Sequence, residues 1–180
     1  MKRILSGLVL LGCAIGAMSA GADERFKFEA YPASAVSTKA VSKIDWKSNK
    51  DLASYWKAKE AVEGAVGKKP DFAGHFVVTS FGCGSGCTAT VFVDTNSGKV
   101  YKAPMSETST QDGAHKASSN IIFMSDYKYV NGGPDMMETP GVVAWNEKAS
   151  KFEILHKDKP VKVEMEWCES RVASVGCNVL

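Results

Sequence analysis

Two cysteines that enclose a short glycine-rich turn are the residues best suited to chemistry in this chain. The segment Cys83-Gly84-Ser85-Gly86-Cys87 lies between two stretches in which apolar and polar residues alternate, the pattern of β-strands. Glycines supply the positive φ angles of a tight turn. Cysteines at the two ends of such a turn can come within disulfide reach, so a bond between them would close a small loop.

Three other chemistries are open to the same segment. Thiol redox catalysis uses two cysteines with two residues between them at the start of a helix, whose dipole lowers the thiol pKa. Here three residues lie between the cysteines, and predicted strands flank the pair. Two thiolates with His75, His115 or His156 would bind copper or zinc, but no histidine is near the cysteines in sequence. Ser85 as a nucleophile would need glycines where the cysteines stand. We favour a structural disulfide.

His75 directly precedes the first of the two alternating stretches. It is a candidate base or ligand, but we prefer to interpret it as a hydrogen-bonded histidine at the edge of a sheet. No carboxylate pair stands out, because aspartate is common in turns for backbone reasons. Phosphate-binding and zinc-protease motifs are lacking. We therefore predict a protein that is not an enzyme, with no metal and no cofactor. The aspartates in turn-like contexts are Asp94, Asp112, Asp126 and Asp135.

The chain begins like a secretory signal peptide. A short basic segment is followed by an apolar run from Ile4 to Ala17, and Ala20-Gly21-Ala22 before Asp23 fits a cleavage site. The apolar run is shorter than the roughly 20 residues that a membrane span needs. We predict that residues 1–22 are removed, and that the remaining chain is periplasmic or secreted and has no membrane span.

A second processing signal competes with this one. Leu10-Leu11-Gly12-Cys13 resembles a lipobox, which would acylate Cys13 and make the protein an outer-membrane lipoprotein. Leu11 is unusual at its position, so we favour the signal-peptide interpretation. Residues 23–180 have the length of one domain with its own core, and we predict a single globular domain.

Export changes how the cysteines are interpreted. Removal of the first 22 residues leaves four cysteines, an even number that indicates two disulfides in an oxidising compartment. Four cysteines allow three connectivities. The local one pairs Cys83 with Cys87 and Cys168 with Cys177 and needs no long-range assumption. Such short loops contribute about 2 kcal/mol each, so these bonds would fix the shape of loops more than total stability.

The residue pattern predicts an α+β fold, an antiparallel β-meander of six to eight strands with one long helix packed on it. Helical spacing begins at Leu52 after a capping sequence at Ser48-Asn49-Lys50-Asp51, and it includes Tyr55 and Trp56, which we expect in the core. Residues 33–43 and 105–118 are expected to be coil or loop. Strands are predicted at residues 25–30, 76–81, 88–94, from 100, 120–125, 142–145, 152–155 and 161–167.

Composition narrows the range of partners. The chain has 22 lysines and arginines against 20 aspartates and glutamates, for a formal net charge of +2. No basic stripe interleaved with aromatic residues is present, so we expect no nucleic acid as a partner.

The central motifs resemble those of a known group of proteins. F-A-G-H-F, G-C-G-S-G-C and G-K-V-Y are similar to motifs of a widespread family of exported bacterial proteins of unknown function. The resemblance extends from about Phe26 to Leu155. It implies a common fold and brings no established activity. The family's cysteine pair is of the G-C-G-x-x-C type, and G-C-G-S-G-C fits that pattern.

The chain is also loosely similar to the periplasmic inhibitors of vertebrate lysozyme, which are small, exported α+β proteins. That family uses a disulfide-closed loop between two strands to plug an enzyme cleft. The corresponding loop here is shorter and lacks the family's histidine. We therefore expect a non-enzymatic, inhibitor-type binding module that presents residues 83–87, with His75 nearby, to another protein in the envelope or outside the cell. The alternative is a periplasmic copper, zinc or thiol-redox protein that uses the same cysteines.

Overall fold

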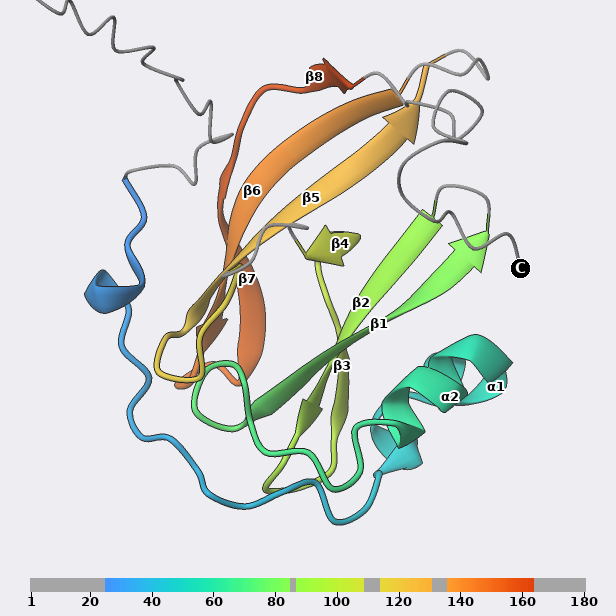
Figure 1. The fold of residues 1–180 in the computed structure, drawn as a ribbon, viewed down its shortest axis with the longest axis vertical. Coiled ribbons are helices and arrows are strands. Elements are labelled where there is room, and N and C mark those ends of the chain that lie inside the picture. The colour runs from blue at the N-terminus through green and yellow to red at the C-terminus, as the bar shows by residue number, and fades with distance from the viewer. Residues whose placement is uncertain (1–24, 85–86, 109–113, 131–135, 164–180) are drawn as a thin grey trace, which may run out of the picture.

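The computed structural model describes residues 25–84, 87–108, 114–130 and 136–163, which form two antiparallel β-sheets and a pair of short helices (Figure 1). One sheet has three strands in the order β1-β2-β3. The other has five, in the order β4-β5-β6-β7 with β8 paired to β6. The elements are the 3-10 helices η1 (Phe28–Ala30) and η2 (Trp46–Ser48), helices α1 (Lys50–Ser54) and α2 (Trp56–Glu63), and strands β1 (Phe76–Gly84), β2 (Cys87–Asp94), β3 (Val100–Lys102), β4 (Glu107–Thr108), β5 (Ile121–Tyr129), β6 (Met136–Asn146), β7 (Lys151–Lys157) and β8 (Val161–Val163).

The predicted β1–β2 hairpin and its third strand are confirmed. Phe76 pairs with Asp94 and Val77 with Val93, and the pairing continues to the end of β1. Because successive side chains of a strand point to opposite faces, this register divides the hairpin into two apolar faces. The hairpin of β6 and β7 also forms where residues 142–145 and 152–155 predicted it.

Three apolar clusters lie on the faces of the two sheets. The first lies between the sheets, the second between the three-stranded sheet and the helices, and the third on the outer face of the five-stranded sheet. This gives a layered molecule, in which both faces of β1 are buried at its start, at Phe76 and Val77. Fully buried members are Phe76, Phe92, Ile122 and Val143 in the first cluster, Val62, Val77, Val91 and Val93 in the second, and Ile121 in the third.

The single long helix that we expected is not present. The helical segment is divided at Tyr55, whose backbone is extended (φ −99°, ψ 112°). Tertiary contacts account for the break, because the Tyr55 ring lies 5.5 Å from that of Phe81 and its hydroxyl donates to the Gly82 carbonyl at 3.2 Å. None of the helices in the described ranges has the length and apolar character needed to cross a membrane.

Two expectations about aromatic residues are corrected. Trp56 does not pack in the core as predicted: it is 65% exposed, since the break at Tyr55 turns it away from the sheet. The strand expected at residues 25–30 is instead an irregular segment with one 3-10 turn. Its apolar side chains still pack on the five-stranded sheet, where the rings of Phe28 and Phe123 lie 5.4 Å apart, edge to face. The alternation of apolar and charged residues therefore indicated which side chains pack on the sheet, although no strand forms there.

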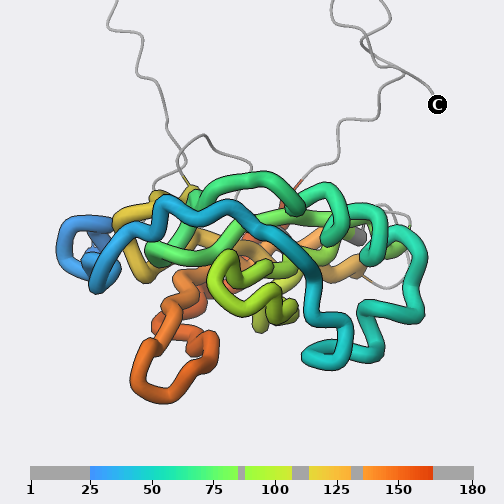
Figure 2. Tube along the Cα trace, turned by 90° about the horizontal axis from the view of Figure 1, so that it is seen from below, coloured from blue at the N-terminus to red at the C-terminus, as the bar shows by residue number. Residues whose placement is uncertain are grey.

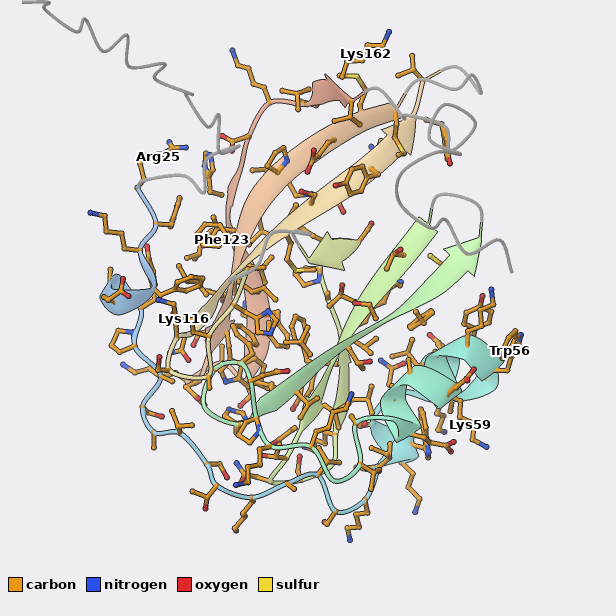
Figure 3. The ribbon with its side chains drawn as sticks, viewed as in Figure 1. Arg25, Trp56, Lys59, Lys116, Phe123 and Lys162 are labelled. Atoms are coloured by element: carbon orange, nitrogen blue, oxygen red, sulfur yellow. The ribbon has the colours of Figure 1, made fainter. Side chains whose placement is uncertain are left out.

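The N-terminal segment runs along the periphery from the five-stranded sheet to the helices (Figures 1 and 2). The stretch predicted as coil, residues 33–43, is largely without regular structure. Backbone hydrogen bonds nevertheless fix this segment: Ser37 N–H donates to the Gly74 carbonyl at 2.7 Å and Asp45 N–H to the Gly98 carbonyl at 2.8 Å. The start of the segment is held by an ion pair, in which the Lys116 ammonium lies 3.2 Å from the Glu29 carboxylate. Figure 3 places Lys116 and Phe123 on this side of the molecule.

Candidate functional site

The far end of the β1–β2 hairpin carries the predicted cysteine loop. Cys83 is disulfide-bonded. The side chain of Cys87 lies outside the described part of the structure, as do Ser85, Gly86, Cys168 and Cys177, so both predicted pairings stay predictions. The register of the two strands shifts just before the loop, where Gly82 pairs with Thr88 and Gly84 pairs with Cys87. Gly84 has a φ of 146°, which glycine adopts readily.

A pocket lies directly beside this end of the hairpin. It has a volume of about 380 Å³ and is formed by the first turns of α2 and the last third of β1. Trp56 stands at its rim, and the Lys57 ammonium lies 5.5 Å from the centre of the indole ring. In Figure 3 the Trp56 side chain extends outward from the helix. The lining residues are Trp56, Lys57, Glu60, Ala61, Ser80, Phe81 and Gly82.

Strand β1 also exposes part of its backbone beside the pocket. Within the described residues, β1 has a neighbouring strand on one side only. Thr90 directs its backbone groups away from β1, because its N–H donates to Ser106 and its carbonyl accepts from Ala103. Ser80 is the residue opposite Thr90. In an antiparallel pair such residues point their backbone groups outward together, so the N–H and C=O of the exposed Ser80 face the open edge of the sheet.

His75, at the opposite end of β1, lies between two carboxylates. Its Nδ1 is 3.2 Å from Asp94 Oδ1 and its Nε2 is 3.2 Å from Glu147 Oε1. The imidazole packs on the Phe76 ring at 4.2 Å and approaches Trp145 edge to face at 5.9 Å. The His75 side chain is only 17% exposed. We call this group of three side chains, His75, Asp94 and Glu147, the His75 clasp.

The geometry of the clasp indicates the protonation state of His75. An ionised carboxylate only accepts hydrogen bonds, so both ring nitrogens must donate, which requires the imidazolium form. Burial alone lowers the pKa of His75, but the hydrogen bond and charge of Asp94, followed by those of Glu147, outweigh it and raise the pKa above 6.5. Burial raises the pKa of Asp94, but hydrogen bonds from His75, Ser97 and the Asn96 backbone lower it below 3.8 overall.

The F-A-G-H motif holds His75 in this position. Ala73 and Gly74 both have positive φ angles, 45° and 77°, which turn the chain sharply before β1. A Cβ on Gly74 would lie 1.9 Å from the Ala35 carbonyl oxygen, so only glycine fits. The motif therefore brings the N-terminal segment that runs along the periphery, at Ala35 and Ser37, against the start of β1.

A second pocket, of about 360 Å³, opens between this peripheral segment and the clasp. Ser34 and Ser37 line it together with His75 and the two carboxylates. Since a carboxylate occupies each ring nitrogen, His75 has no free nitrogen with which to act as a base in this arrangement. His75 is thus hydrogen-bonded through both ring nitrogens, in keeping with the hydrogen-bonded histidine that we preferred.

The structure does not bring all the predicted site residues together. His75 and Cys83 lie at opposite ends of β1, roughly 26 Å apart at about 3.3 Å per residue (Figure 1). His75 therefore does not adjoin the cysteine loop, and the binding role predicted for both stays a prediction. His115 and His156 are also engaged elsewhere, His115 near Asp71 at 3.8 Å and His156 with Asp158 at 2.9 Å.

Sequence reasoning missed Glu147 and Trp56. Glu147 is 72 residues from His75, and its only local feature is a place in a hairpin turn. Trp56 was recognised but assigned to the core. Its exposure follows from the break at Tyr55, which depends on contacts with Phe81 and Gly82 far along the chain, so no local signal could have found it.

Comparisons with protein-family models, with curated proteins and with solved structures find no match to this chain. The resemblances to an exported bacterial family and to lysozyme inhibitors therefore remain predictions.

Proposed function

We propose that the protein is an exported, non-enzymatic binding module that presents the cysteine loop and the adjoining pocket to a protein partner. The observation that carries the proposal is Trp56, which is 65% exposed at the rim of a pocket that adjoins the loop-bearing end of β1. Exposed tryptophans beside well-formed pockets are frequent centres of binding energy in protein interfaces.

Three features of this surface support protein recognition. Trp56 and Phe81 offer apolar contact, the pocket accepts a side chain, and the backbone of Ser80 offers a donor and an acceptor. An extended segment of a partner fits these together, because it can hydrogen-bond to Ser80 at the edge of β1, between Val78 N–H, which donates to Asp71, and the Gly82 carbonyl, which accepts from Tyr55, and can place one side chain in the pocket. A short loop closed by a disulfide would lose little conformational entropy on binding.

The copper, zinc or thiol-redox alternative has less support. Cys83 is disulfide-bonded, and a disulfide sulfur is not the thiolate that copper or zinc binding needs. Redox catalysis favours cysteines at the start of a helix, whereas strands β1 and β2 flank this pair. No observation brings a histidine toward Cys83 among the described residues. We therefore retain the binding module as the proposal.

Photo-crosslinking tests it. A benzophenone amino acid is placed at position 56, at position 85 in the loop, or at the control position 154, and each protein is produced in its native cells. Ile154 is a suitable control because it is 42% exposed but lies on β7, in the other sheet. We expect one discrete adduct of the same mass from positions 56 and 85 and none from 154. Equal labelling at all three positions, or no adduct at 56 and 85, would refute the proposal.

A second variant tests the open edge. Ser80→Pro removes the outward N–H and keeps the pairing of β1 with β2, since proline is tolerated at a strand edge. It should abolish the adduct from position 56, whereas Ser80→Ala, which keeps the N–H, should retain it. Equal adduct yields from the two variants would show that the partner does not pair with β1.

A further inference from the structure

The His75 clasp joins the two sheets at the end of the molecule opposite to the cysteine loop. Asp94 ends β2 of the three-stranded sheet, and Glu147 begins the turn between β6 and β7 of the five-stranded sheet. The imidazole is the common partner of both carboxylates. The protonation state of His75 therefore determines whether this contact between the two sheets is attractive.

The two carboxylates are held to different degrees. Asp94 is fixed without His75, because it also accepts from Ser97 Oγ at 2.6 Å and from Asn96 N–H at 2.8 Å. No further side-chain contact holds Glu147 within the described residues, and its side chain is 40% exposed. Loss of the proton would thus leave Asp94 in place and detach the Glu147 side chain from it, while the turn keeps its own hydrogen bond from Ala149 N–H to Asn146 Oδ1.

We propose that His75, held between Asp94 and Glu147, is a proton-dependent clasp that fastens the β6–β7 turn to the end of β2 and releases it when the imidazole loses its proton. In the protonated state both ring nitrogens donate to carboxylates. In the neutral state one nitrogen becomes an acceptor, and its lone pair faces a carboxylate oxygen that also carries negative charge. Asp94 keeps the remaining donor, since its position is fixed, and Glu147 is repelled.

Among the described residues, Asp94 and Glu147 are the charged groups that shift the pKa of His75. Tyr101, on β3, is a titratable neighbour of Asp94, but burial, followed by the charge of Asp94, raises its pKa above 10, so it is neutral where the imidazole titrates. The segment that lines the pocket, residues 34–37, has no charged side chain. The charge on the clasp therefore changes with the protonation of the imidazole.

The direction of the effect on stability follows from the raised pKa of His75. A folded-state pKa above the unfolded value of 6.5 adds stability that is complete below 6.5 and is lost as the pH rises through the folded value. The lowered pKa of Asp94 sets the acid limit, since its contribution is present above 3.8 and is lost as the pH falls through the lower folded value. The clasp holds between these limits.

Nuclear magnetic resonance of the labelled protein between about pH 5 and pH 10 tests the proposal, a range that brackets the ordinary histidine value. We expect the His75 ring to titrate above 6.5, and the amides of residues 147–150 to shift and exchange faster with the same midpoint. A ring that titrates at or below 6.5 would overturn the proposal. So would turn amides that do not follow the ring, since His75 would then be a static contact.

Two glutamine variants separate the clasp from general charge effects. Glu147→Gln should move the His75 midpoint down toward 6.5 and uncouple the turn amides from it. Glu153→Gln is the matched control, because Glu153 lies in the same hairpin but contacts Asn146 and Lys151 rather than the imidazole. Equal midpoints in the two variants would refute the assignment of Glu147.

Discussion

Replacement of Gly74 by alanine is the most direct test of how the F-A-G-H motif builds this end of the molecule. Gly74 has a φ of 77°, and a Cβ there would lie 1.9 Å from the Ala35 carbonyl oxygen, where real Cβ contacts essentially never fall below 3.0 Å. The backbone near Ala35 must therefore move by about an ångström. That movement would disrupt the hydrogen bond from Ser37 N–H to the Gly74 carbonyl.

The cost has two parts. A residue other than glycine in the left-handed region costs about 1–2 kcal/mol, partly offset by about 0.4–1 kcal/mol from the less flexible unfolded chain. The overlap adds about 1–3 kcal/mol for strain and about 1 kcal/mol for the lost hydrogen bond. Gly74→Ala should therefore destabilise the protein by roughly 3–5 kcal/mol, mostly through the steric part.

Gly67→Ala is the matched control. Gly67 has nearly the same φ, 83°, but a Cβ there would meet nothing within 4 Å. It should cost only the backbone part, about 1 kcal/mol. Urea unfolding of both variants measures the difference, which amounts to a midpoint about 1–2 M lower for Gly74→Ala if the slope is typical. Equal midpoints would refute the close approach of Ala35 to Gly74.

Substitutions at three further positions test the elements around the proposed binding surface. Asn49→Ala removes the side chain that accepts from Leu52 N–H at the start of α1 and should cost about 0.5–2 kcal/mol in urea unfolding, whereas Asn49→Ser should be nearly neutral. Phe92→Ala removes a ring stacked on Phe152 at 4.1 Å and should cost about 3–5 kcal/mol, while Trp56→Ala should stay within about 0.5 kcal/mol. A large loss of stability in Trp56→Ala would show that this side chain is structural.

The hairpins were predictable because their signals are local. Alternation in β1, β2, β6 and β7 records which side of a strand is buried, and the glycines and polar residues between the strands mark the turns. The division into two sheets could not be predicted in this way. Both faces of the β1–β2 hairpin are apolar, and the sequence does not say whether a helix or another sheet covers each of them.

The break in the helix shows how tertiary contacts override a periodic pattern. Residues 50–63 have helical spacing, yet Tyr55 leaves the helix to contact Phe81 and Gly82. These partners lie on β1, more than twenty positions further along the chain, so no window of local sequence contains the information. The exposure of Trp56 follows from the same contact and was missed for the same reason.

The candidate site was predictable to the extent that its residues are neighbours in sequence. The cysteine loop is enclosed within five residues and could be located from spacing alone. The clasp joins His75 to Asp94 across a hairpin and to Glu147 across two sheets, at separations of 19 and 72 residues. Asp94 was expected only as a turn residue, a role it also fills through its contacts with Asn96 and Ser97.

The two ends of β1 are held in place by different interactions. Phe76 and Val77, at the start of β1, are fully buried in the apolar clusters on its two faces. The clasp adjoins this core, since the His75 ring packs on Phe76 at 4.2 Å, whereas the proposed recognition loop lies at the less buried end of β1. The strand that joins the two sites thus keeps them energetically separate, as residues more than about 10 Å apart without shared partners usually are.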